Sequence, residues 1–416
     1  MAGLAGPELI DPAHYAQHGY PHETFARLRS EAPVYWYEDY ELPFWALTRR
    51  AEMVEVARQP ERFVSGPRFQ ILVGAEYGSE DPREPETLVQ MDPPKHGARR
   101  SLLSRRFTPR ALRGLEGDVE RLAAELLDEL EAGGARGECD FVEQVAAPLP
   151  IAVIAKLLDL PRRDWRRLFH WTNAVAGATD PEFQLPGESA HETRLRATEE
   201  VYDYFASLLE ARADGEGVDL VSLLARARPE GEPLPPHELV SFCLLLLVAG
   251  NETTRNALSG GLLALMEHRE QWRALQGDPS LVGRACEEIL RWTTPVVHNA
   301  RTAVVDTEVA GRRVRAGETL ALFWPSANRD ETVFDDPDRF RIDRYPNPHL
   351  AFGIGEHVCM GAHLARMELR AVLRELVSRL DSIEQTGRAT RLHSSSVGGI
   401  KTLPIRYRFA ARRALR

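Results

Sequence analysis

Apolar residues recur every three to four positions along most of this chain, which is the period of an α-helix packed on one face. The clearest example ends at Gly133-Gly134, and its apolar positions are Leu112, Leu115, Val119, Leu122, Leu126 and Leu130. Similar spacing predicts further helices over residues 23–30, 50–58, 150–158, 165–176, 188–211 and 279–292. We therefore expect a mainly α-helical protein.

One predicted helix, over residues 237–267, is apolar on every side at its centre. It would be about 45 Å long at 1.5 Å per residue, and an all-apolar helix is normally buried. The apolar run ends abruptly at Asn251-Glu252-Thr253-Thr254-Arg255-Asn256. A carboxylate and a hydroxyl are costly inside a buried helix unless they are paired or used. Glu252 and Thr253 are therefore candidate site residues, the alternative being a structural polar cluster. Gly250 before them would give a flat ligand room to approach.

Short strand-like stretches interrupt the helices. They are predicted at residues 34–37, 44–47, 300–305, 307–309 and 319–323, with turns at Gly311 and Gly317. The segment 390–407 predicts a small hairpin whose tip is Val397-Gly398-Gly399-Ile400. No linker or internal repeat divides the chain, so we expect a single unit over residues 1–416. Its β-rich contributions would come from about 30–66, 300–325 and 388–410.

Composition limits the classes of function. The 416 residues include 52 Lys and Arg against 62 Asp and Glu, and the net charge of -10 argues against general nucleic-acid binding. Four scattered cysteines match no zinc spacing and fit a reducing compartment. The N-terminus shows no signal peptide, and the longest apolar run is too short to span a bilayer. We expect a soluble, cytoplasmic monomer.

The stretch with the most specific chemistry is Phe352-Gly353-Ile354-Gly355-Glu356-His357-Val358-Cys359-Met360-Gly361. Its glycines allow a tight turn before Cys359, and helical spacing resumes at Gly361. The dipole of that helix would favour the thiolate. A single thiolate with no second cysteine nearby suits one axial bond to a metal held by other ligands, as in haem. An inert buried cysteine is the alternative.

This stretch resembles the cysteine-ligand loop of the cytochrome P450 haem-thiolate monooxygenases, Phe-Gly-x-Gly-x-His-x-Cys-x-Gly, and matches every fixed position. The resemblance covers nearly the whole chain. It implies the cytochrome P450 fold, with a large helical domain, a smaller β-rich lobe, and haem b between the central long helix and the helix that follows the cysteine loop. Cys359 would be the axial ligand of the haem iron, with Phe352 and Gly353 beside the haem.

The resemblance assigns further roles. The pair His96 and Arg100, which share a helix face, would bind the haem propionates together with Arg301 and His357. The run Ala249-Gly250-x-Glu252-Thr253 matches the family's oxygen-activation motif. Ala249 and Gly250 would then flank the haem, Thr253 would hydrogen-bond dioxygen, and Glu252 would feed a proton relay.

A structural ion pair is also implied between Glu288 and Arg291, which lie three positions apart on one predicted helix. In the resembled family a second arginine completes this pair. Arg329 and Arg339 are the two candidates for that position.

The implied reaction is insertion of one atom of O2 into a C–H bond of a hydrophobic molecule. The candidate substrate-wall residues are apolar: Leu244, Val248, Val296, Val297, Val397 and Ile400. The loop over 67–90 would cover the substrate. The oxygen-activation run is similar to that of actinobacterial enzymes acting on steroids, branched lipids and terpenoids; tailoring of a polyketide or another secondary metabolite is the alternative.

Electrons would come from a separate ferredoxin and its NAD(P)H-dependent reductase, because no flavin or iron–sulfur domain is visible. The docking face would be formed by Arg99, Arg100, Arg105 and Arg106, with Arg366 and Arg370 as further candidates. Two other classes of function stay open. A peroxide-driven peroxygenase would normally lack the Glu252-Thr253 pair. A non-catalytic haem-thiolate sensor would need an effector domain or a sixth protein ligand, for which His298 is a candidate.

Overall fold

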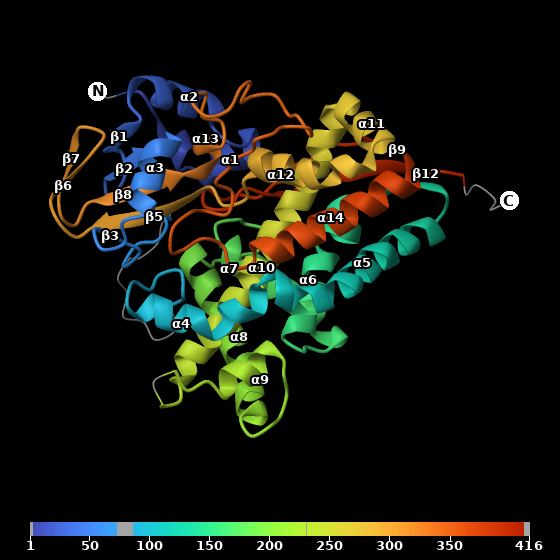
Figure 1. Ribbon diagram of the computed structural model, residues 1–416, viewed down its shortest axis with the longest axis horizontal. Coiled ribbons are helices and arrows are strands. Elements are labelled where there is room, and N and C mark those ends of the chain that lie inside the picture. Colours follow the sequence, from blue (N-terminus) through green and yellow to red (C-terminus); the bar gives the residue numbers. More distant parts are fainter. Residues whose placement is uncertain (1–2, 73–85, 230, 412–416) are drawn as a thin grey trace.

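The computed structural model describes residues 3–72, 86–229 and 231–411. Helices make up most of this part of the chain, so the predicted mainly α class is confirmed. Most strands gather at one end of the molecule, a smaller group lies near the opposite end, and long helices fill the space between them (Figure 1). No helix in the described ranges is long and apolar enough to cross a membrane.

The predicted helices form within two residues of their expected ends, except that the one over 279–292 starts with a 3-10 turn. The helices of the described residues are α1 (Pro12–His18), α2 (His22–Glu31), α3 (Arg50–Ala57), α4 (Lys95–Ser104), α5 (Pro109–Ala132), α6 (Pro148–Leu157), α7 (Trp165–Ala176), α8 (Ala190–Arg212), α9 (Leu220–Ala225), α10 (Pro236–Glu267), α11 (Arg269–Gly277), α12 (Val282–Thr293), α13 (Trp324–Ala327) and α14 (Ala362–Arg379).

Local signals explain several helix ends. Ser189 and Glu192 form a reciprocal capping box at the start of α8, which satisfies two backbone N–H groups. At α5, Thr108 caps the helix and Pro109 occupies its first position. The helix α10, whose centre is apolar on every side, crosses the molecule and packs against α6, α7, α8, α12 and α14, as that apolar centre predicts.

The strands form one five-stranded sheet and three smaller ones. They are β1 (Val34–Tyr37), β2 (Phe44–Leu47), β3 (Phe63–Val64), β4 (Arg136–Asp140), β5 (His298–Ala303), β6 (Thr307–Val309), β7 (Arg312–Val314), β8 (Thr319–Phe323), β9 (Leu380–Gln385), β10 (Thr390–Arg391), β11 (Ile400–Thr402) and β12 (Pro404–Phe409). The large sheet has the order β1-β2-β8-β5-β3. Its parallel β2–β8 pair joins distant parts of the chain, and Trp45 Nε1 donates to Glu318 Oε2 across it at 2.7 Å.

The hairpin predicted over 390–407 is wrong in its second half. β10 pairs with β11, whereas β12 lies between β4 and β9 in another sheet. Alternation explains this position, because Ile405, Tyr407 and Phe409 of β12 are buried while the residues between them are exposed. The predicted strand over 300–305 is also shifted: Val304 and Val305 are exposed, at 44% and 49%.

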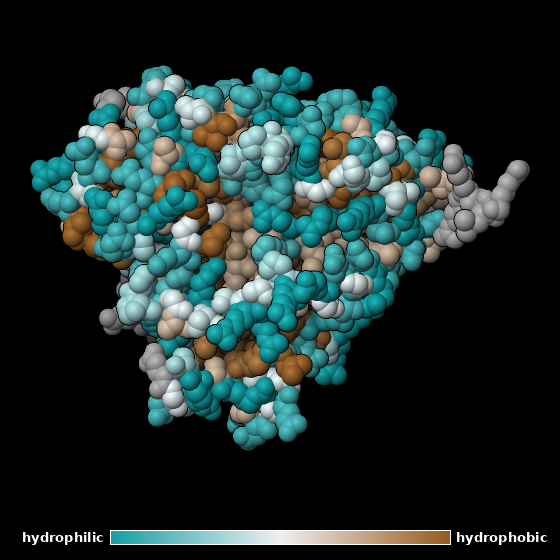
Figure 2. Space-filling view, viewed as in Figure 1, coloured by the Kyte–Doolittle hydropathy of each residue, from teal (hydrophilic) through white to brown (hydrophobic). Residues whose placement is uncertain are grey.

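Two hydrophobic clusters meet at the stretch before Cys359. One cluster is formed by the long helices, and Phe352 and Met360 pack against it. The other is formed by the N-terminal helices and the five-stranded sheet, and Ile354 packs against that one. Polar side chains cover most of the face shown in Figure 2, with smaller hydrophobic groups between them. The cysteine stretch therefore lies at the junction of the two packed bodies.

Candidate active site

The loop before Cys359 is shaped by two glycines in the left-handed region, Gly353 at φ +67° and Gly355 at φ +81°. Gly355 is also tightly packed, since a Cβ there would lie 2.3 Å from the carbonyl oxygen of Ala57. The backbone closes with a hydrogen bond of 2.9 Å from Cys359 N to Phe352 O, and α14 begins three residues after the cysteine. The loop therefore holds the cysteine in a fixed position.

The Cys359 side chain is exposed although protein surrounds it closely. Burial in this recess raises the pKa of its thiol; the Gly361 backbone N–H and the charges of Arg100 and Arg366 oppose that rise without cancelling it. The thiolate is thus less favoured than the helix position alone predicts. A metal bonded to the sulfur would displace the proton outright. An accessible thiol in a low-dielectric recess fits a metal ligand better than an inert core cysteine.

The α10 residues of the candidate site face in different directions. Ala249 is exposed although it lies in the middle of a buried helix. A Cβ on Gly250 would lie 3.3 Å from the Ile154 side chain, so this glycine permits close packing of α10 on α6. The hydroxyl of Thr253 donates to Ala249 O at 2.8 Å. Ala249 and Thr253 therefore border the same accessible space.

Glu252 is buried and paired. Its Oε2 accepts from Arg255, one turn further along α10, and its Oε1 accepts from Asn251 Nδ2 at 3.2 Å. The network continues to α7, because Arg255 Nη1 donates to Asn173 Oδ1 at 2.6 Å. Burial raises the pKa of Glu252, and the arginine opposes that rise. Sequence reasoning missed Arg255, although its i+3 spacing is a signal for such a pair.

The four residues proposed to bind carboxylates come from three separate segments and converge. The rings of His96 (α4) and His357 (cysteine loop) stack with centroids 4.0 Å apart. Arg100, one turn after His96, donates to Val358 O at 2.6 Å. Arg301 is buried on β5. Burial is the main cause that lowers the pKa of His357 to about 3, followed by the Arg301 charge, and both favour a neutral ring.

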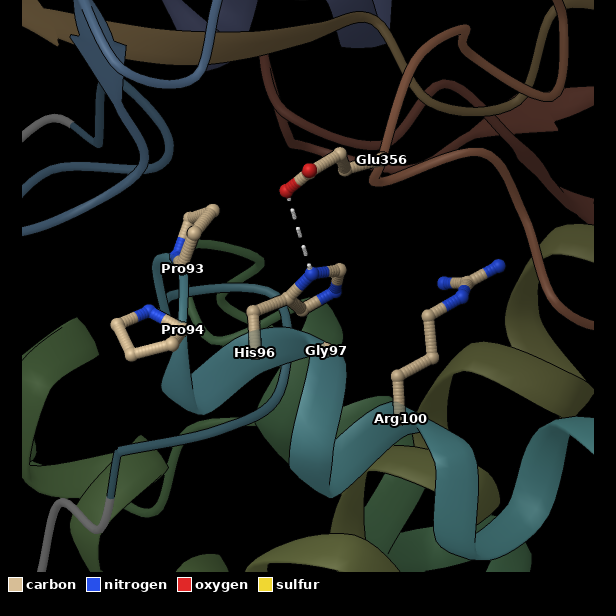
Figure 3. Close-up of a pocket in the computed structure, with 6 residues that line it drawn as sticks. All are labelled: Pro93, Pro94, His96, Gly97, Arg100 and Glu356. Atoms are coloured by element: carbon tan, nitrogen blue, oxygen red, sulfur yellow. Dashed lines mark ion pairs between the residues drawn. The ribbon is translucent and has the colours of Figure 1, made fainter.

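Part of this group lines a recess of about 270 Å³, whose walls are Pro93, Pro94, His96, Gly97, Arg100 and Glu356. Figure 3 shows the His96 ring and the Arg100 side chain rising from the same face of α4, with Glu356 approaching from the opposite loop. The Glu356 Oε2 atom lies 3.9 Å from His96 Nδ1.

A ring nitrogen without a partner and a guanidinium without a carboxylate partner indicate what this group could hold. His96 Nε2 is buried without a hydrogen-bond partner. Arg301 forms no ion pair with any described residue, and burial lowers its pKa to about 10. A buried cation without a partner is unfavourable, so the group fits an anionic ligand with two acidic arms. The two propionates of a haem bonded to Cys359 have that chemistry.

Glu288 and Arg291 form the predicted ion pair, but the arginine that completes it is Arg344. Arg291 donates to both carboxylate oxygens of Glu288, at 2.8 and 2.7 Å, and Arg344 Nε donates to Oε2 at 3.0 Å. Both sequence candidates are wrong for a physical reason. Arg329 pairs with Asp338, and the side chain of Arg339 is 74% exposed.

The candidate substrate-wall residues differ in their surroundings. Val296 and Val397 form a β-bridge and are half-buried, as is Val248 on α10. Gly399, next to Ile400, packs directly against Asn256 of α10. In contrast, Val297 is fully buried in the cluster around the five-stranded sheet and offers no surface to a ligand. The predicted covering loop over 67–90 lies partly outside the described residues.

His298 is not placed to bind a metal. Its Nε2 accepts a hydrogen bond from Ile71 N at 2.9 Å, so that lone pair is already used. The ring is fully buried and packs against Phe323. The proposed sixth ligand of a haem-thiolate sensor therefore has no support in the geometry.

Comparison with known proteins decides the family. Residues 146–409 match the family model described as Cytochrome P450. The chain is 37% identical to a methyl-branched lipid omega-hydroxylase of Mycobacterium tuberculosis, over 92% of this chain and 90% of that protein. It is 36% identical to linalool 8-monooxygenase of Pseudomonas putida, over 96% of this chain and 98% of that protein. The chain belongs to the cytochrome P450 family.

A solved structure agrees with this assignment. The cytochrome P450 of Mycobacterium marinum in complex with pseudoionone superposes with a TM-score of 0.89 at 35% identity, covering 97% of this chain and 99% of that one. The predicted cytochrome P450 fold is thereby confirmed. Family membership makes the protein an oxidoreductase of the monooxygenase class and implies haem b as its cofactor.

Proposed function

We propose that this cytochrome P450 hydroxylates a branched, hydrophobic small molecule of the terpenoid, steroid or lipid class, and that Cys359 would hold the haem iron. The observation that carries the proposal is the accessible Cys359 thiol, held by a two-glycine loop at the start of α14. When bound, the haem supplies the activation of dioxygen and the oxidation of the C–H bond. The protein residues bind, orient and insulate it.

His96, Arg100, Arg301 and His357 anchor the haem propionates. The support is the unpartnered Nε2 of His96 and the buried guanidinium of Arg301, which donates to Ala300 O but has no carboxylate partner among the described residues. A bound carboxylate would satisfy both groups, and charge-assisted hydrogen bonds of this kind are stronger than neutral ones. The stacked His96 and His357 rings fix the direction in which their nitrogens point.

Glu252 would hold a proton that the reaction consumes, and the Thr253 hydroxyl would pass that proton on. The raised pKa of Glu252 keeps it partly protonated at a pH where an exposed carboxyl is ionised. Because its carboxylate faces Asn251 and Arg255, the proton enters from the α7 side. Thr253 must turn its hydroxyl away from Ala249 O to donate elsewhere.

The substrate class is inferred from the wall and the relatives. The half-buried wall residues Val248, Val296 and Val397 offer only apolar contact, which suits a hydrocarbon-rich molecule. The relatives named above are a methyl-branched lipid hydroxylase and a linalool monooxygenase. A branched chain or a terpenoid has the shape and polarity that both names share.

A ferredoxin supplies the electrons through a face formed by Arg105, Arg106, Arg110 and Arg113, all of them exposed. Two arginines expected there are already engaged. Arg99 donates to Glu238 at 2.8 Å and is 11% exposed, and Arg366 makes two bonds of 2.7 Å to Glu287. The docking face is therefore centred on the turn between α4 and α5, and Arg370, a further candidate, is half-buried on α14.

The first experiment is the absorption spectrum of the reduced, carbon-monoxide-bound protein, with Cys359→Ser as the matched variant. We expect the red-shifted band of thiolate ligation in the wild type and its loss in the variant. Titration with linalool, pseudoionone, a methyl-branched fatty acid and testosterone then tests the substrate class through the shift of the resting spectrum. A wild-type spectrum without the thiolate band would overturn the ligand assignment. A response to none of the four compounds would overturn the substrate class alone.

A further inference from the structure

Asp92 connects two segments that are far apart in sequence. Its Oδ1 accepts from Ser65 N at 2.7 Å, and its Oδ2 accepts from Gly66 N at 3.0 Å. Both carboxylate oxygens therefore hold the turn that follows β3. The backbone oxygen of the same residue accepts from His96 N at 2.9 Å, in the first turn of α4. One aspartate thus fixes the β3 turn relative to α4.

Each of these two connections ends at a histidine of the proposed propionate-binding residues. Ser65 is fully buried, and its Oγ lies 3.1 Å from Nε2 of His357. His96, held through the backbone, stacks on that same His357 ring. Asp92 is therefore linked to His357 through Ser65 and to His96 through its own backbone oxygen, although its side chain touches neither ring.

The Asp92 charge acts on the same group from a distance. It favours the charged form of Arg301 and of His96, against burial, which lowers the pKa of both. Glu356 provides an internal comparison. It lies 3.9 Å from His96 Nδ1 in the recess of Figure 3 and is 47% exposed. Its carboxylate can act on His96 by charge, but it does not hold Ser65.

We propose that Asp92 is a positioning residue for the proposed propionate-binding residues, because it sets the orientation of His357 through Ser65 and of His96 through its own backbone. Its carboxylate also lowers the reduction potential of the haem. This inference rests on the proposed propionate role of His96 and His357. Positioning and charge are separable, because Ser65 carries only the first effect and Glu356 only the second.

The test compares Asp92→Asn, Ser65→Ala and Glu356→Gln with the wild-type holoenzyme. The measurements are the rate of haem transfer to an excess of apomyoglobin and the midpoint reduction potential. Loss of one hydrogen bond of about 1 kcal/mol predicts a roughly threefold to tenfold faster release for Ser65→Ala. We expect the same or more for Asp92→Asn, together with a higher potential. Glu356→Gln should raise the potential without speeding release, because a carboxylate in the recess can only repel the acidic arms of the ligand.

Two further variants keep the result interpretable. Ser65→Thr retains the hydroxyl and should restore slow release, which a loss of packing would not do. His357→Ala tests the underlying propionate role by itself. Unchanged release in His357→Ala would overturn that role. Faster release in His357→Ala, with wild-type release in both Asp92→Asn and Ser65→Ala, would overturn only the positioning by Asp92. Equal effects of Asp92→Asn and Glu356→Gln on both measurements would mean that Asp92 acts only through its charge. That result would also overturn the positioning role of Asp92.

Discussion

Arg344 Nε donates to Oε2 of Glu288 at 3.0 Å, and the carboxylate that accepts this bond is fully buried between two arginines. The second guanidinium, that of Arg291, also donates to backbone oxygens of Asn328 and Pro337. Asn328 Oδ1 in turn accepts from Leu350 N at 2.6 Å, just before the cysteine loop. The ion-pair network therefore holds the segment that leads into Cys359.

Replacement of Arg344 by Met should destabilise the fold by about 3–5 kcal/mol, because it removes one partner of a buried charge. Urea denaturation followed by far-UV circular dichroism measures this loss. Arg339→Ala is the control, and we expect it to change the unfolding free energy by less than about 0.5 kcal/mol, since its side chain is exposed. Equal unfolding midpoints for the two variants would contradict the assignment.

Glu252→Gln should lower the rate of product formation about 100-fold, within the range found for loss of a general acid. Binding of substrate should be unchanged, because Glu252 faces α7 rather than the substrate wall. The checks are the turnover rate, its solvent isotope effect and the spectral dissociation constant. Glu267→Gln, at the exposed end of α10, is the control. A variant with a weakened spectral affinity but normal turnover would contradict the proton-holding role.

Gly353 and Gly355 form a matched pair for the cysteine loop, because both have positive φ but only Gly355 is tightly packed. Gly353→Ala should cost about 1–2 kcal/mol from backbone strain alone, since the nearest atom to its Cβ is 3.9 Å away. Gly355→Ala adds a clash with Ala57 O and should lose haem during purification. The ratio of haem to protein absorbance distinguishes the variants; equal ratios would show that the contact can relax.

The protein should lose stability as the pH falls from about 6.5 to 4, in part because of His298. Burial lowers the pKa of His298 to about 4, so the unfolded chain binds a proton in this range that the folded chain does not. Stability therefore rises with pH, and the contribution is about 3 kcal/mol. His298→Gln keeps an acceptor for Ile71 N without titrating, and its melting temperature should fall less across this range. An equal fall in melting temperature for the wild type and His298→Gln would contradict the assignment.

Neutralising Arg105 and Arg106 with glutamine should slow reduction by ferredoxin about tenfold at low ionic strength. The difference should shrink as salt is added, because long-range charge attraction is screened. Stopped-flow reduction measures the rate. Arg313→Gln with Arg315→Gln removes the same charge from two exposed positions, one within β7 and one just after it, and should have little effect. If both double variants slow reduction equally, the rate depends on the net charge of the protein, and the proposed docking face is contradicted.

Features set by short-range rules were predictable from the sequence. Helix period, capping residues and the two-glycine loop depend on neighbours within a few positions, and their elements form close to the expected ends. The predictions that failed depend on three-dimensional proximity. No local sequence pattern distinguishes Arg329, Arg339 and Arg344 as the partner of Glu288. Only the path of the chain after Asn328 decides which of them reaches that carboxylate.

The same distinction explains the failure at the strands. The alternation in β12 was visible, but its partners β4 and β9 come from segments that showed no strand pattern of their own. At Gly250 the approach of a flat ligand stays a prediction, and the packing against Ile154 could only come from the structure. Arg255 was within reach of a local rule, since it lies one turn from Glu252.

The bond between Trp45 and Glu318 has a consequence for how the protein is made. The two residues are 273 positions apart in sequence, so a ribosome working at about 5–20 residues per second needs roughly 15–55 s to produce the second after the first. During that interval the β1–β2 hairpin has an open edge where β8 will later pair. Unpaired edges of this kind can associate with other chains. We therefore expect the yield of folded protein in cells to depend on chaperones that shield the N-terminal strands. Lower expression should raise this yield when it dilutes the associating chains more than it slows their translation.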